Sequence, residues 1–141
     1  MSLLNAFRIS STGLQAQSVR LNAVASNMAN ADTVSSTAED AYKARKVVFE
    51  AAKASGPAGA NGQGLAADVR IKELTEDKSA PRQMYEPSNP LANADGFVFA
   101  SNVNAAEEMV DLIAASRSYQ TNADVMNTMK TLMLKTLQIG Q

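Results

Sequence analysis

Residues 103–139, VNAAEEMVDLIAASRSYQTNADVMNTMKTLMLKTLQI, decide the fold. Apolar and small residues recur in this stretch at alternating spacings of three and four, the period of a helix with a coiled-coil seam. Between Met126 and Leu137 the apolar residues cover more than one face, so a single partner helix cannot bury them all. At about 1.5 Å per residue, we expect a helix of about 55 Å. Its seam positions are Met109, Leu112, Ser116, Tyr119, Ala123, Met126, Lys130, Met133 and Leu137.

Residues 1–31 show the same seam from the other end of the chain. Arg8 and Arg20 are the only charged side chains there, whereas a solvated helix of that length usually carries alternating charges. We therefore expect a helix that ends near Asn30 and is covered over most of its circumference. Glycine at position 13 lowers the stability of the helix by about 1 kcal/mol relative to alanine. Gly13 therefore marks either an exposed site or a close approach by another helix. The seam positions are Leu4, Phe7, Ser11, Leu14, Ser18, Leu21, Ala25 and Met28.

Three short strands are predicted in the middle of the chain. One ends in a β-branched and aromatic run, a second alternates apolar and charged side chains, and a third follows the turn signal Asp95-Gly96. Their ranges are 42–50, 67–74 and 97–99. Glycines at 54–64 indicate a loop, and prolines at 79–93 exclude a regular helix. These segments predict a small β-rich module with little core.

The expected fold class is mainly α, with long N- and C-terminal helices packed as a coiled-coil-like pair and the β-rich module and loops between them. We expect Ser101 or Asn102 to cap the last helix, because their side chains can accept a hydrogen bond from its first turn. The expected parts are an N-terminal axial helix at 1–34, the middle module at 35–100, and a C-terminal axial helix at 101–141 that packs with the first.

Composition excludes several classes of function. A net charge of −1 gives no bulk attraction to nucleic acid or to an anionic membrane. The chain has no cysteine and no histidine, which excludes disulfides, typical zinc sites and Ser-His or Cys-His catalysis. No basic start precedes an apolar run and no apolar stretch is long enough to cross a bilayer, so we expect neither a Sec-type signal peptide nor membrane insertion.

The residue clusters that could carry chemistry have simpler explanations. The acidic residues at 107, 108 and 111 suit the positive end of a helix better than a cation site. The basic residues at 43, 45 and 46 suit the solvated face of a strand, and the glycines at 54–64 lack the lysine of a phosphate loop. We therefore expect no catalytic residue, no cofactor, no metal and no enzymatic activity.

Two architectures remain open from the pattern alone. Small seam residues permit close helix contact and amides specify register, but both weaken an isolated helix pair. The chain is either an imperfect antiparallel helical hairpin in a monomer or a subunit whose helices are completed by neighbours. The wide apolar face of the last helix and the nearly uncharged first helix favour assembly.

Several motifs resemble the rod proteins of the bacterial flagellar basal body. Residues 25–33, ASNMANADT, are similar to the N-terminal signature of flagellar axial proteins. The second half is similar to the proximal rod proteins over four motifs in order: YEPSNPL at 85–91, DGFV at 95–98, NV at 102–103, and EMVDLI at 108–113 with ASRSYQTN at 115–122. The resemblance covers residues 1–50 and 84–141, and an alternative within the same class is another axial subunit.

This resemblance implies a structural subunit of the proximal rod that assembles helically into the drive shaft and export channel. Its implied partners are other copies of itself, sibling rod proteins, the adaptor proteins between the MS ring and the rod, and the flagellar type III export apparatus. The implied location is the periplasmic rod, reached without a cleavable signal peptide. A different class, a helical adaptor or chaperone of a secretion system, stays open as an alternative.

The resemblance also assigns roles to residues. Asn27, Asn30 and Asp32 would end the first helix and direct the chain towards the β-rich module, and Arg117 would form an ion pair between subunits. The implied assembly interface consists of Leu4, Phe7, Leu14, Leu21, Met28, Met109, Leu112, Tyr119, Met126, Met133 and Leu137.

Overall fold

The computed structural model describes residues 3–53 and 67–139, and the loop expected at 54–64 lies outside them. Two long helices run antiparallel, α1 (Leu3–Ala29) and α2 (Ala105–Ile139). Their 27 and 35 residues correspond to about 40 and 52 Å at about 1.5 Å per residue. The predicted helices are thus confirmed to within two residues at each described end.

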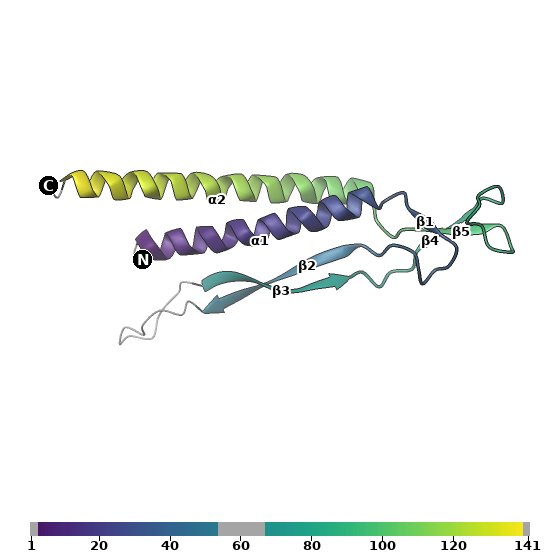
Figure 1. Ribbon diagram of the computed structural model, residues 1–141. Helices are drawn as coiled ribbons and strands as arrows, with labels where there is room; N and C mark the ends of the chain where they lie inside the picture. The colour runs from purple at the N-terminus through teal and green to yellow at the C-terminus, as the bar shows by residue number, and fades with distance from the viewer. Residues whose placement is uncertain (1–2, 54–66, 140–141) are drawn as a thin grey trace.

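A β-hairpin lies against α1 on the side away from α2 (Figure 1). It consists of β2 (Arg45–Lys53) and β3 (Ala67–Glu76), which pair antiparallel with a register shift between Val48 and Phe49. Because the hairpin and α2 both contact α1, two sides of the nearly uncharged helix are covered, but Leu4, Phe7, Ser18 and Ala25 stay exposed, so the chain's own fold covers less of α1 than its composition predicted.

A three-stranded antiparallel sheet forms the end of the molecule beyond the hairpin (Figure 1). Its order is β1 (Val34–Ser35), β5 (Phe97–Ala100) and β4 (Arg82–Tyr85). The sequence predicted β5 but not the two edge strands. Gly96 precedes β5 with φ of 80°, and a Cβ there would lie 2.9 Å from the Tyr85 ring, so the predicted Asp95-Gly96 turn requires glycine.

The core of the molecule is small and built from small side chains. Ala31, Ala44 and Val103 form a buried cluster with Tyr42 packed against it, where the two helices meet the strands. The largest fully buried side chains are Val98, Asn27 and Ser101. Two of these three are polar, so hydrogen bonds carry a large share of the specificity of the fold.

Asn104, and not Ser101 or Asn102, caps α2. The Asn104 side-chain oxygen accepts a hydrogen bond from the Ala106 N–H at 3.1 Å. The two expected caps are engaged elsewhere: the Ser101 hydroxyl donates to the Ala31 carbonyl at 2.7 Å, and the Asn102 side chain joins the strands. The prediction was wrong because these tertiary bonds compete for the same side chains.

Candidate assembly surface

Polar and small residues line the contact between α1 and α2. Asn27 donates to Glu108 at 3.0 Å, and Arg20 donates to Asp111 at 2.8 Å. A Cβ on Gly13 would lie 3.1 Å from the Asn122 amide nitrogen. Gly13 therefore marks a close approach by another helix, which was one of its two interpretations. These three α1 residues, at 13, 20 and 27, are seven positions apart and so lie on one face of the helix; we call them the α1 contact line.

Asn27 lies at one end of this contact and is 1% exposed. Its amide group donates to the Arg45 carbonyl at 2.9 Å as well as to Glu108. Its oxygen accepts from the Arg45 N–H at 2.8 Å and from the Tyr42 hydroxyl at 3.1 Å. One side chain near the end of α1 thus holds both α2 and the first residue of β2.

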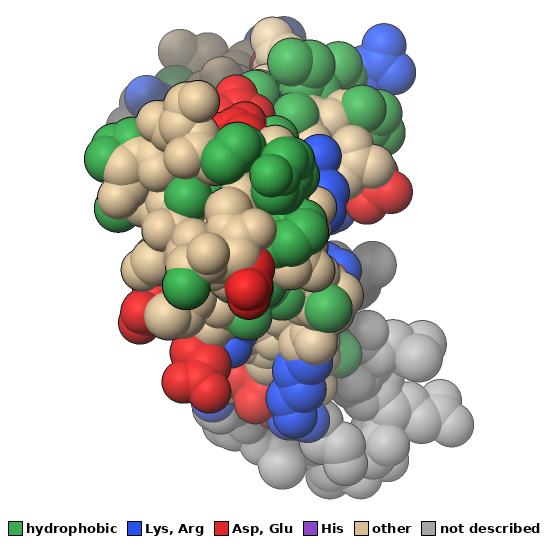
Figure 2. All heavy atoms as spheres, turned by 90° about the vertical axis from the view of Figure 1, so that its right-hand side faces the viewer, with side chains coloured by type: hydrophobic (Ala, Val, Ile, Leu, Met, Phe, Trp, Pro, Cys, Tyr) green, Lys and Arg blue, Asp and Glu red, His purple; other side chains and the backbone are tan. Residues whose placement is uncertain are grey.

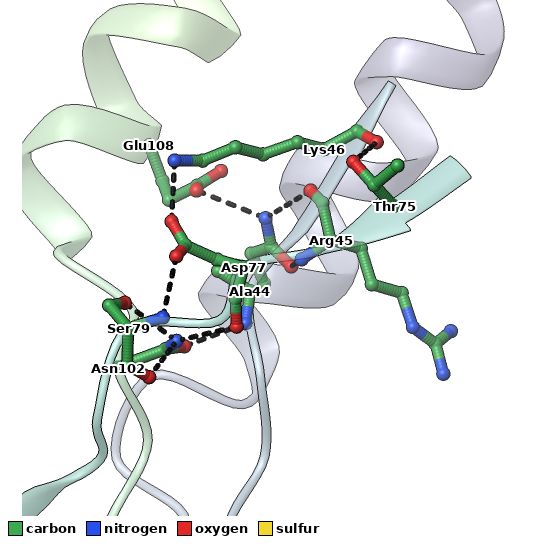
Figure 3. A network of polar contacts seen from close by, with 9 residues as sticks. Ala44, Arg45, Lys46, Thr75, Asp77, Ser79, Asn102 and Glu108 are labelled. Atoms are coloured by element: carbon green, nitrogen blue, oxygen red, sulfur yellow. Dashed lines mark hydrogen bonds and ion pairs between the residues drawn. The ribbon is translucent and has the colours of Figure 1, made fainter. Parts of the chain in front are cut away.

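Asn102 plays a matching role just before α2 (Figure 3). Its oxygen accepts from the Ala44 N–H at 2.7 Å, and its amide donates to the Asp77 and Ser79 carbonyls at 3.2 and 3.1 Å. The residue before β2 and the segment after β3 are therefore joined through one amide. Together with Asn27, it fixes the hairpin relative to the helices.

Glu108 is a buried acid beside this network. Burial raises its pKa, and the hydrogen bond from Asn27 opposes that shift. Among the described residues its second carboxylate oxygen has no hydrogen-bond partner. It borders a cavity of about 290 Å³ between α1, β2 and α2, whose lining includes Val24, Val47 and Phe49.

Lys46 and Asp77 form an exposed ion pair of 2.6 Å at the base of the hairpin (Figure 3). The hydrogen bond from Lys46, together with those from Ser79, lowers the pKa of Asp77 from 3.8 to about 2. The same bond and the charge of Asp77 raise the pKa of Lys46. Because the ionised carboxylate is the form that the fold favours, its stabilisation is present above pH 3.8 and lost as the pH falls through about 2.

We expect Asp77→Asn to be less stable than the unchanged chain near neutral pH, and this difference to vanish as the pH falls to about 2. Urea unfolding at a series of pH values measures it. Glu73→Gln, at an exposed position of β3, is the control. A difference that stays constant down to pH of about 2 would contradict this role of the ion pair.

The predicted seam of α1 is not the face that contacts α2. We call its eight positions, listed in the sequence analysis, the α1 stripe. Successive residues of a helix are about 100° apart. Leu14 and Leu21 each follow a contact residue by one position, and Ser18 and Ala25 each precede one by two positions. The α1 stripe therefore lies about 100–160° around the helix from the contact residues at 13, 20 and 27. Leu4 is 72% exposed, and Phe7, Ser18 and Ala25 are also exposed. Ser11, Leu14, Leu21 and Met28 are half-buried at the edge of the contact.

On α2, four of the nine predicted seam positions are half-buried, and Ala123 is one of them. Leu112, Met126 and Met133 are half-buried, while Tyr119 is exposed. The other line of the contact is Glu108, Ala115, Asn122 and Met129, one residue before the predicted Met109, Ser116, Ala123 and Lys130. Met109 is accordingly exposed.

The end of α2 extends past α1. Gly13 opposite Asn122 and Asn27 opposite Glu108 define a register that places Leu3 opposite Leu132. Figure 1 shows α2 continuing beyond the described beginning of α1. Leu137 in this extension is 68% exposed, and Leu134 is exposed too.

The remaining predicted residues lie at the helix end and on the outer face. α1 ends at Ala29, and the Asn30 amide donates to the Ser26 carbonyl at 2.8 Å, as expected of a helix-end residue. Asp32 is exposed in the turn that follows, and Arg117 is exposed on α2. Figure 2 shows further exposed hydrophobic side chains on the sheet end of the molecule, where Tyr85 and Leu91 are exposed.

Residues 3–53 and 67–139 contain no cluster of acidic, histidine or cysteine side chains that could hold a metal ion. In the same part of the chain no helix is long and apolar enough to span a membrane. The described part of the molecule is elongated, and both of its helices carry exposed apolar side chains.

Comparison with known proteins identifies the family. Residues 7–34 match the family model for the flagella basal body rod protein, and residues 94–139 match that for the C-terminal part of the flagellar basal body rod FlgEFG proteins. The flagellar basal-body rod protein FlgC of Yersinia enterocolitica is 48% identical over 141 residues, all of both chains. The chain belongs to the FlgC family of flagellar basal-body rod proteins. FlgC of Salmonella typhimurium, also aligned over both full lengths, is 45% identical, and FlgC of Bacillus subtilis is 35% identical over 150 aligned positions.

The FlgC family is one of structural rod subunits and not of enzymes, and its members are components of the flagellar basal body. The two family models cover most of α1 and α2, the elements that contact each other through Asn27 and Glu108. The sequence named Asn27 as a helix-end residue and Glu108 as helix-start charge, but nothing in the pattern indicated that they meet. It likewise named Asn102 only as a cap.

Proposed function

We propose that this chain assembles helically, with copies of itself and with sibling rod proteins, into the proximal rod. This rod is the drive shaft that transmits torque and encloses the export channel. The observation that carries the proposal is the α1 stripe: an uncharged, heptad-spaced surface in which Leu4, Phe7, Ser18 and Ala25 are exposed and the other four positions are half-buried. Exposed apolar side chains that recur along one face of a helix mark a surface for a partner, because a partner helix removes them from water.

The interface residues follow from this assembly. On α1 they are Leu4, Phe7, Leu14, Leu21 and Met28, and on α2 they are Met109, Leu112, Tyr119, Met126, Met133 and Leu137. Neighbouring subunits complete a coiled-coil-like arrangement of the terminal helices around the axis. Arg117 forms an ion pair with another subunit, and Asn27, Asn30 and Asp32 set the exit of the chain from α1. Residues 1–34, 35–100 and 101–141 serve as two axial helices and a middle module.

A shaft of this kind carries twist through many dispersed contacts, so no single residue acts as a catalytic group does. The uncovered extension of α2 supports contacts beyond the chain's own helix pair. The subunit reaches the periplasm through the flagellar type III export apparatus without a cleavable signal, and adaptor proteins join the rod to the MS ring.

Cells that lack this chain are expected to be non-motile, and their basal bodies to lack the proximal rod. Electron microscopy of isolated basal bodies and a swimming assay test this, with re-expression of the unchanged chain as the control. Normal swimming without the chain would contradict the proposed function.

A further inference from the structure

We propose that the α1 stripe of one copy is covered by α2 of a second copy. The α2 residues that make this contact form a patch, of which only Met109 belongs to the predicted interface. This α2 patch consists of Met109, Val110 and Ile113. The inference rests on the proposed rod assembly and names the contact between neighbouring copies.

The α2 patch faces away from the chain's own α1. Val110 follows the buried Glu108 by two residues, which places it about 200° around the helix from that contact. Val110 is 66% exposed, Ile113 is 61% exposed, and Met109 is exposed as well. Three exposed apolar side chains within one turn are unusual on a solvated helix, which normally carries polar residues on its outer face.

The α1 stripe has the shape to receive these side chains. It carries no charge, and it alternates large residues with small ones: Ser18 and Ala25 lie between Leu14, Leu21 and Met28. Small residues at seven-residue spacing leave holes into which a facing helix inserts its side chains. The Arg8 and Arg20 charges are directed instead to Asp68 and Asp111 within the chain.

A rod needs a contact that can be repeated from copy to copy, and this requirement favours α2 over α1 as the helix that covers the α1 stripe. Contact between two α1 stripes would use the same surface on both copies, and such a pair closes at two subunits and cannot extend into a rod. Contact between the α1 stripe and the α2 patch joins unlike surfaces and stays open for further copies. If the copies point in the same direction, α1 and the neighbouring α2 run antiparallel, and their helix dipoles attract as they do within the chain.

Cysteine cross-linking tests the contact, because the chain itself has no cysteine. We propose that the contact between copies keeps the register that joins α1 and α2 within the chain, which places Ala25 of one copy opposite Val110 of the other. Cells expressing Ala25→Cys and Val110→Cys together are expected to yield a disulfide-linked dimer of the two variants in isolated basal bodies after mild oxidation. Ala25→Cys with Ile113→Cys, one turn further along α2, is the second pair.

The control pair is Ala25→Cys with Gln83→Cys, an exposed position on β4, for which we expect no dimer. Basal bodies that contain the variants but give no mixed dimer with either pair would overturn this inference and leave the rod assignment intact. A dimer of Ala25→Cys with itself would overturn it in favour of contact between two α1 helices. Absence of the unchanged chain from basal bodies would instead overturn the proposed function.

Discussion

Leu21→Asp is expected to abolish swimming while the protein is still expressed. Leu21 lies in the middle of the α1 stripe, and a partner helix packed there would bury an unpaired carboxylate. Burying one charge without a partner costs several kcal/mol, which is enough to remove a subunit contact. A swimming assay with quantification of the protein measures the effect.

Two variants make this prediction specific. Leu21→Met keeps an apolar side chain of similar volume at the same site and should swim normally. Leu4→Asp alters a stripe residue that is 72% exposed, so it should leave the folding of the isolated chain unchanged and still impair swimming. Normal swimming of both aspartate variants would count against the α1 stripe as an interface.

Asn27→Ala is expected to lower the free energy of unfolding of the isolated chain by roughly 2–4 kcal/mol. The substitution removes four hydrogen bonds and leaves the Arg45 N–H and carbonyl without their partners beside the buried Glu108. Each buried polar group that loses its partner costs about 1–3 kcal/mol. Urea unfolding followed by circular dichroism measures the loss.

Asn22→Ala, at an exposed position of the same helix, is the matched control and should change the stability by less than about 0.5 kcal/mol. A loss below about 1 kcal/mol for Asn27→Ala would show that Asn27 does not hold α1, α2 and β2 together.

The period of the apolar residues sufficed to predict both helices and β3, while β-branched and aromatic residues indicated β2 and the Asp95-Gly96 turn indicated β5. Polar residues after Met28 and the glycine turn at 95–96 supplied the boundaries. β1 has two residues, too few to show an alternation, and β4 lies between Pro81 and Pro87, which masked its pattern.

The α1 side of the contact with α2 could not be predicted from hydrophobicity. Its contact line is made of Gly13, Arg20 and Asn27 on α1, which carry no apolar signal, facing Glu108 and Asn122 on α2. The apolar period of α1 belongs to another face, of whose eight positions four are exposed and four are half-buried. The hydrophobic seam of α1 therefore did not identify the face on which the chain folds on itself, and we propose that this face binds the next subunit.

A reconstruction of isolated basal bodies that resolves this subunit tests the central claim most directly, because it shows what covers the α1 stripe in the assembled state. We predict that the subunit lies in the proximal rod with Leu4, Phe7, Leu14 and Leu21 buried against a helix of another subunit. A subunit located in the rod with this stripe facing solvent would contradict the account.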